Sequence, residues 1–144
     1  MLDESAWLAY QSSIIAGALQ IYKSMKDGID VVIHCSDGWD RTSQLCCLTQ
    51  IMFDPYYRTI EGFIVLIEKD WINFGHQFGI RSGVLLKQGH EEQRAPIFLQ
   101  FLDSVYQLLK QFPISFEYNK LFLLEIIPHI YSNQFGTFLC NNYQ

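Results

Sequence analysis

The sequence has no hydrophobic run long enough to cross a membrane. Its longest apolar stretch, around residues 14–21, is interrupted by Gln20, whereas a membrane-spanning helix needs about 20 apolar residues. The opening Met-Leu-Asp-Glu carries no basic charge, so it lacks the start that is typical of a secretory signal peptide. We therefore predict neither a membrane-spanning helix nor a secretory signal peptide in this sequence.

The sequence also lacks an excess of basic over acidic residues. The 144 residues contain 10 Lys and Arg against 15 Asp and Glu, which gives a net charge of −5. A broad nucleic-acid-binding surface is therefore not expected, because such a surface needs clustered positive charge. Internal repeats and low-complexity segments are absent from the sequence as well. The length corresponds to one small domain or to part of a larger one.

Cysteine is scarce, and the four cysteines are Cys35, Cys46, Cys47 and Cys140. No pair of them has the spacing of zinc ligands, so no metal site is predicted. We interpret the last three as small apolar groups in or near the core. What the chain has in abundance is apolar residues, at 49%, and aromatic residues, at 15%. These proportions indicate a packed interior rather than disorder.

Hydrophobic periodicity predicts a mostly helical chain. The clearest pattern covers Thr59–Phe74, where apolar residues follow the i, i+3, i+4, i+7 rule. Gly28 is a stop signal after the first helix, and Asn119 is a candidate cap for the last one. Pro128 should kink or end that last helix. The predicted helices cover residues 5–26, 42–53 and 59–74, the segment between Pro96 and Pro113, and a segment after Asn119.

Only one strand is predicted with comparable clarity. The β-branched run Val31–Ile33 is typical of a buried strand, and Phe135–Leu139 offers a second short one. A single strand cannot form a sheet, because it needs partners on its edges. We therefore expect an α/β fold in which this chain is the C-terminal, mostly helical part of a larger domain. The sequence leaves open whether the other strands precede Met1 in the parent or come from another chain, in a homo- or hetero-oligomer.

The segment after this strand has the pattern of a phosphate-binding loop. Cys35, five residues and Arg41 lie between the predicted strand and a predicted helix, so the unit strand–loop–helix covers 31–53. The helix points its free backbone amides and positive dipole end into the loop. The amides from Ser36 to Arg41 can then converge on the oxygens of a phosphate, and Gly38 permits the tight turn. This pattern predicts a cysteine-dependent phosphatase.

Cys35 is the candidate nucleophile of that loop. A free thiol has a pKa of about 8.5, but a helix N-terminus and a nearby cation lower it, which yields a thiolate at neutral pH. The thiolate would attack phosphorus and form a phosphocysteine. Arg41 offers a planar fork to two phosphate oxygens and to the charge of the transition state. Thr42 can donate a hydrogen bond to the sulfur and help it to leave in the hydrolytic step.

The departing alcohol needs a proton donor, and the loop holds two acids, Asp37 and Asp40. Either carboxylate can instead stabilise the loop by accepting hydrogen bonds from backbone amides, a common role of Asp in turns. Trp39 can pack beneath the loop or cover the substrate. These alternatives stay open on the residues alone.

Beyond this pattern, the sequence resembles the myotubularin family over nearly its whole length. The similar segments are Trp7–Leu8, His34–Thr42, Tyr57–Phe63, Glu68–Trp71, Phe74–His76, Pro96–Phe101 and Phe135–Phe138. The resemblance implies a cysteine-phosphatase α/β domain that is larger than this chain. Residues 1–144 would then be a partial catalytic domain, without the upstream half of that domain and without the family's lipid-binding domain.

The resemblance also implies an activity, namely removal of the 3-phosphate from phosphatidylinositol 3-phosphate and from the 3,5-bisphosphate, without a cofactor or metal. It implies Cys35 as nucleophile, Asp40 as general acid and Arg41 as phosphate binder. The implied substrate-binding residues are the other loop positions and one downstream arginine, namely Ser36, Asp37, Gly38, Trp39, Thr42 and Arg81. The implied partner is a phosphoinositide head group on an endosomal-type membrane, to which a cytoplasmic protein binds peripherally.

One departure from the family pattern bears on substrate choice. The family usually has Lys or Arg where this sequence has Gln77, so we expect a preference for the singly phosphorylated lipid. Two other functions compete with an active lipid phosphatase. The first is an inactive fragment or adaptor, against which the presence of both Cys35 and Arg41 argues. The second is a protein tyrosine or dual-specificity phosphatase, against which the two loop aspartates argue.

Overall fold

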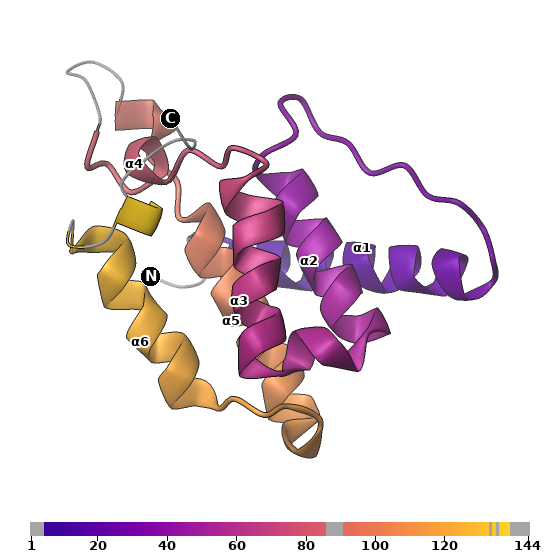
Figure 1. Cartoon of the computed structure of the whole chain (residues 1–144). Coiled ribbons are helices and arrows are strands. Elements are labelled where there is room, and N and C mark those ends of the chain that lie inside the picture. Colours follow the sequence, from indigo (N-terminus) through magenta and orange to yellow (C-terminus); the bar gives the residue numbers. More distant parts are fainter. Residues whose placement is uncertain (1–4, 86–90, 133, 135, 139–144) are drawn as a thin grey trace.

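The computed structural model describes residues 5–85, 91–132, 134 and 136–138. Within these residues the chain is mostly helical and contains no strand (Figure 1). None of the described helices is both long and apolar enough to span a membrane. The α-helices are α1 (Trp7–Lys26), α2 (Arg41–Phe53), α3 (Ile60–Ile67), α4 (Phe78–Arg81), α5 (Ile97–Gln111) and α6 (Lys120–Tyr131).

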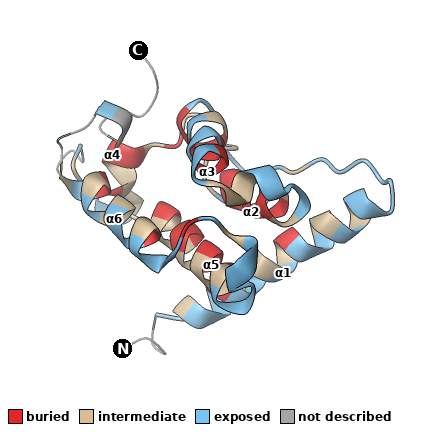
Figure 2. Cartoon of the chain, turned by 60° about the horizontal axis from the view of Figure 1, so that its bottom comes forward, coloured by how far each residue is buried: buried red, intermediate tan, exposed pale blue. Residues whose placement is uncertain are grey.

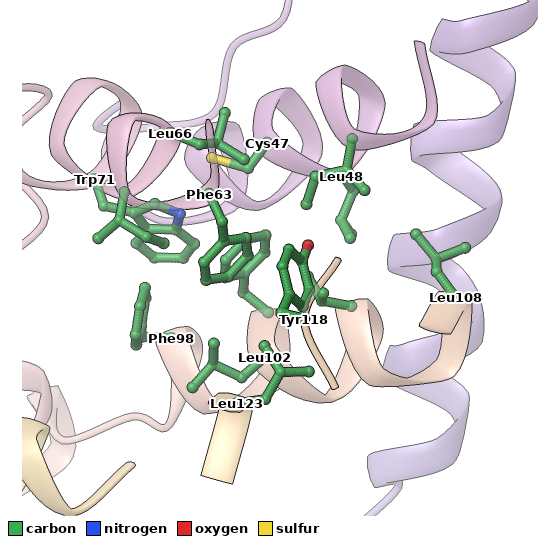
Figure 3. Close-up of a cluster of buried hydrophobic side chains, with 14 of the residues drawn as sticks. Cys47, Leu48, Phe63, Leu66, Trp71, Phe98, Leu102, Leu108, Tyr118 and Leu123 are labelled. Atoms are coloured by element: carbon green, nitrogen blue, oxygen red, sulfur yellow. The ribbon is translucent and has the colours of Figure 1, made fainter. Parts of the chain in front are cut away.

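Helix α5 lies at the centre of the packing and contacts α1, α2 and α6. Its apolar residues recur at helical spacing and are buried along one face. The aromatic ring of Phe63 from α3 stacks on that of Phe101, with the ring centres 6.1 Å apart. The indole of Trp71 meets Phe98 edge-on at 4.8 Å. These rings form the cluster in Figure 3, which ties the segment after α2 to α5.

Side-chain caps mark the starts of helices α3 and α6. The Asn119 side chain accepts hydrogen bonds from the backbone amides of the first turn of α6, which confirms the predicted cap. The Thr59 hydroxyl accepts one from Gly62 at the start of α3. Helix α6 does not end at Pro128 but continues to Tyr131, so of the two predicted outcomes, a kink or an end, the end is not seen. Proline removes only one donor, and its usual acceptor belongs to Leu124, which is exposed to water.

The helix predicted over Thr59–Phe74 divides into two parts. Helix α3 ends at Ile67, and the π-helical turn Glu68–Ile72 follows it directly. In this wider turn Asp70 and Trp71 are both buried although they are adjacent. Asp70 accepts a hydrogen bond of 2.6 Å from Gln50 of α2, while Trp71 faces the aromatic cluster. The turn therefore joins α2 to the core.

The strand predicted over Val31–Ile33 is not present in the structure. Residues 29–35 run as an irregular segment that arcs away from the helices (Figure 1) and is coloured mostly as exposed in Figure 2. Val32 is 88% exposed. β-branched residues favour a strand only where a neighbouring strand accepts the backbone hydrogen bonds, and the described part of the chain supplies no such neighbour.

The second predicted strand, over 135–139, lies partly outside the described residues. Its described part, Gly136–Phe138, forms a 3-10 turn. The α/β arrangement is therefore not seen in the described residues, whose architecture is the helical portion of a domain.

Candidate active site

The predicted phosphate loop leads directly into helix α2. The helix begins at Arg41, one residue earlier than predicted, and the backbone amide of Gln44 donates to the carbonyl of Asp40 at 3.1 Å. Gly38 has a φ of 88°, in the left-handed region that glycine adopts without steric cost. The loop therefore lies at the positive end of the α2 dipole, where an anion is stabilised.

The Cys35 sulfur lies within the turn of this loop. The backbone amide of Gly38 donates a hydrogen bond of 3.1 Å to Sγ. Burial would raise the pKa of the Cys35 thiol, but hydrogen bonds from the Thr42 side chain and from the backbone amides of Gly38, Thr42 and Asp37 lower it to about 7. A large fraction of the sulfur is therefore thiolate at neutral pH.

The other described cysteines differ from Cys35 in the direction in which the pKa of the thiol is shifted. Cys46 is half-buried and Cys47 is buried, as predicted for small apolar groups. Burial and, secondarily, the charge of Asp70 raise the pKa of both thiols. Cys140 lies outside the described residues. Among the described cysteines, the loop environment thus activates Cys35 selectively.

The exposed side chain of Arg41 folds back over the loop that precedes it. Its Nη2 donates to the hydroxyl of Ser36 at 3.1 Å, and this hydroxyl lies 3.3 Å from a carboxylate oxygen of Asp37. Asp37 is exposed at the surface of the loop. The guanidinium of Arg41, six positions after Cys35, consequently lies against Ser36, the residue next to Cys35.

Asp40 is the more deeply placed of the two loop acids. Arg81 donates to its Oδ2 through Nη2 at 2.8 Å and Nε at 3.1 Å, and Nδ1 of His76 lies 2.8 Å from Oδ1. Burial would raise the pKa of Asp40, but the hydrogen bonds and charges of His76 and Arg81 outweigh burial and lower it. In this structure Asp40 is therefore an ionised carboxylate.

Arg81 lies beside the loop, as the prediction of a shared site requires, although it comes from the end of α4. Its third nitrogen, Nη1, donates to the carbonyl of Gln93 at 2.7 Å. The contact partner of Arg81 in the loop is Asp40. Gln77 is half-buried at the start of α4, next in sequence to the His76 that contacts the loop.

Sequence reasoning missed His76 as a partner of the loop. Besides its approach to Asp40, Nδ1 of His76 lies 3.1 Å from the carbonyl oxygen of Trp39. The same carbonyl accepts a hydrogen bond from the Ser43 hydroxyl at 3.1 Å. The Trp39 side chain is half-buried. The only signal in the sequence was the position of His76 in a segment shared with the family.

Two apolar grooves lie away from the loop. One, of about 420 Å³, lies between α1, α2 and the end of α5. The other, of about 380 Å³, lies between α5 and α6. No loop residue lines either groove. The loop thus carries its chemical groups on an open surface of the described residues.

The loop has the arrangement expected of a cysteine-dependent phosphatase. Comparison with known proteins then identifies the family. The myotubularin-like phosphatase domain model matches residues 1–144. The chain therefore belongs to the myotubularin-like phosphatase family, which confirms the resemblance seen in the motifs.

Individual relatives are similar over nearly the whole chain. A human phosphatidylinositol-3,5-bisphosphate 3-phosphatase, MTMR4, is 49% identical over 142 residues, which cover 98% of this chain and 12% of the relative. The mouse enzyme of the same description, MTMR2, is 51% identical over 99% of this chain and 24% of the relative. A human phosphatidylinositol-3-phosphate phosphatase, MTMR7, is 49% identical over 98% and 21%. The chain thus spans between an eighth and a quarter of the length of these relatives.

Proposed function

We propose that the protein carrying this chain is a phosphoinositide 3-phosphatase that acts through a phosphocysteine. The observation that carries the proposal is the Cys35 thiol, whose pKa is lowered to about 7 at the N-terminal end of α2. The names of the relatives support the substrate class, since they specify phosphatidylinositol 3-phosphate and the 3,5-bisphosphate.

The reaction has two steps. The Cys35 thiolate attacks phosphorus, the S–P bond forms and the bond from phosphorus to the ring oxygen breaks. Arg41 and the backbone amides from Ser36 to Arg41 bind the phosphate oxygens and the charge of the transition state. Water then attacks phosphorus and gives its proton to the carboxylate that donated one in the first step; the S–P bond breaks, inorganic phosphate is released, and the sulfur leaves as a thiolate that the Thr42 hydroxyl stabilises.

The first step needs a proton on the departing ring oxygen, and we assign its donor to Asp40. The carboxylate must first take up a proton that its present partners disfavour. A phosphate dianion in the loop raises the pKa of Asp40 by charge repulsion, and it also competes for the guanidinium of Arg81. Both effects favour the acid form once substrate is bound. Asp37 is the alternative donor, being exposed on the same loop.

We further propose that residues 1–144 are part of a larger α/β catalytic domain. The run Ile29–Ile33 exposes apolar, β-branched residues next to the loop, as a strand does when its neighbours belong to another part of the protein. Pairing with those strands would complete the strand–loop–helix unit over 31–53. Such a domain would act as a cytoplasmic, peripheral protein at an endosomal-type membrane that presents phosphoinositide head groups.

A phosphate-release panel tests this function on the full-length protein. Short-chain phosphoinositides with phosphate at each ring position are compared with tyrosine and threonine phosphopeptides. We expect release from the lipids that carry a 3-phosphate and negligible release from the others. Release from phosphopeptides alone would assign a protein phosphatase, and no release from any substrate would assign an inactive adaptor.

Substrate choice depends on Gln77 in our account. A cationic side chain at this position would add a charge-assisted hydrogen bond to a second phosphate, with a contribution of roughly 1.5–3 kcal/mol, or about tenfold to a hundredfold. Glutamine donates only a neutral hydrogen bond. We therefore expect Gln77→Arg to raise kcat/KM for the bisphosphate more than for the monophosphate.

Gln20→Arg is the matched control, because it adds the same charge at an exposed position of α1. The control should leave the ratio of the two kcat/KM values as it is in the unchanged protein. If Gln77→Arg also leaves this ratio unchanged, residue 77 does not contact the second phosphate.

A further inference from the structure

His76 is a buried histidine whose side-chain polar contacts are both with the phosphate loop. Its side chain is 1% exposed, and its Nδ1 meets the carbonyl oxygen of Trp39 and the carboxylate of Asp40. We propose that His76 is a positioning residue that holds the last two residues of the loop, and with them the Cys35 sulfur, in the geometry of reaction. This role rests on the proposed phosphatase function.

The contacts determine where the imidazole carries its proton. Both neighbours of Nδ1 are acceptors, at 2.8 Å for the Asp40 oxygen and 3.1 Å for the Trp39 carbonyl. Nδ1 must therefore be the protonated nitrogen. The Nδ1–H hydrogen-bonds to the Trp39 carbonyl, and the same nitrogen is in close polar contact with the Asp40 carboxylate, so it faces two successive loop residues.

The ring is held rigidly enough to act as an anchor. Trp71 meets it edge-on at a centroid distance of 4.8 Å, and Phe78 meets it edge-on at 4.6 Å. The His76 backbone amide also donates to the carbonyl of Trp71 at 2.9 Å. Because Trp71 belongs to the π-helical turn that packs on the core, the position of the loop is tied to the core through His76.

Packing alone does not account for a histidine at this position. Its Nε2 is buried without a hydrogen-bond partner among the described residues, and such a nitrogen destabilises the fold by its lost hydration. An apolar ring would fill the slot between Trp71 and Phe78 without that cost. Unlike an apolar ring, His76 has a hydrogen-bond donor at Nδ1. This difference indicates that His76 has a role in holding the loop.

Trp39 and Asp40, the residues that His76 restrains, are connected to the start of α2 and to the surroundings of the Cys35 sulfur. The Trp39 carbonyl also accepts from Ser43, and the Asp40 carbonyl accepts the first helical hydrogen bond of α2. A shift of these two residues moves the start of α2 and the amides that hydrogen-bond to the Cys35 sulfur. The pKa of Cys35 therefore reports on the anchor without requiring any turnover.

Three substitutions separate positioning from packing in the full-length protein. His76→Asn retains a donor near the place of Nδ1, His76→Gln places its donor near Nε2, and His76→Phe fills the slot without a donor. Asn and Gln both remove the ring and so form a matched pair for lost packing. The readouts are kcat, the thermal midpoint, and the rate of Cys35 alkylation by iodoacetamide against pH, followed by mass spectrometry of the Cys35 peptide.

We expect half-maximal alkylation near pH 7 in the unchanged protein. In the Gln and Phe variants the pKa of Cys35 should rise by about one unit, which slows alkylation about tenfold below pH 7. Their kcat should fall by about 10²-fold, the cost of a misplaced reacting group. His76→Asn should retain the low pKa of Cys35 and most of kcat.

Equal effects of Asn and Gln on the pKa of Cys35 would overturn the proposal, as would an unchanged pKa in the Phe variant. The Asn and Gln pair decides the question even where His76→Phe does not fold. A protein that releases no phosphate but shows the expected alkylation pattern would contradict the phosphatase function and leave the positioning role intact. Low kcat with an unchanged alkylation pattern in all variants would contradict only the positioning role.

Discussion

Replacing Cys35 by serine is expected to reduce turnover by about 10⁴-fold or more, while phosphate still binds to the loop. The hydroxyl of serine is a far weaker nucleophile than a thiolate whose pKa is about 7. The backbone amides and Arg41, to which we assign phosphate binding, are not altered by the change. Turnover with a soluble phosphoinositide and the affinity for inorganic phosphate are the two measurements.

Cys46→Ser is the matched control for this experiment. Cys46 lies in the helix that follows the loop, and burial raises the pKa of its thiol, so we do not expect it to attack phosphorus. The control should keep its turnover. Turnover by the Cys35 variant above the background of protein purified in parallel would show that another group attacks phosphorus.

Replacing Asp40 by asparagine is expected to slow substrates according to their leaving group. An inositol oxygen is a poor leaving group and should lose about 10²–10⁴-fold in rate, whereas a nitrophenolate should lose much less because it leaves without a proton. The variant also loses the ion pair with Arg81, a loss that affects every substrate. The ratio of the two rates removes this common loss and isolates the proton transfer.

Asp37→Asn supplies the comparison, because Asp37 is the other loop acid and is exposed. It should reduce both rates by a similar, small factor. If Asp40→Asn slows both substrates equally, Asp40 acts only as a carboxylate that stabilises the loop. If Asp37→Asn shows the leaving-group dependence instead, the donor is Asp37.

Local sequence signals were sufficient for the longer helices but not for α4 (Phe78–Arg81), which was not predicted. The spacing of apolar residues located α1, α2, α3 and α5, and the Asn119 cap located the start of α6. These features depend on residues within a few positions of one another. The π-helical turn at Glu68–Ile72 was not predicted, and it places Asp70 against Gln50 of α2, a contact between residues 20 positions apart.

For the run Val31–Ile33, in contrast, local sequence signals were not sufficient. Its β-branched residues predicted a strand, but a strand forms only with a partner, and Val32 instead is largely exposed in the described part of the chain. Pairing with a strand outside the segment cannot be read from the segment itself. The prediction of a larger α/β domain therefore remains a proposal.

The same distinction between local patterns and contacts of distant residues applies to the candidate site. The Cys35–Arg41 spacing lies within one turn and was visible in the sequence. The contacts of Asp40 with His76 and Arg81 join residues that are 36 and 41 positions apart. No local pattern encodes such contacts, so Asp40 was predicted as a proton donor without the partners that hold it ionised.

The central claim, a phosphocysteine at Cys35 formed from a 3-phosphate, is tested most directly by trapping that intermediate. The full-length protein is mixed with phosphatidylinositol 3-phosphate that is radiolabelled in the 3-phosphate, quenched within the first turnover and cleaved into peptides. Our account predicts label on the peptide that contains Cys35, and none in the Cys35→Ser variant. Release of labelled phosphate without label on Cys35, or label on another residue, would contradict it.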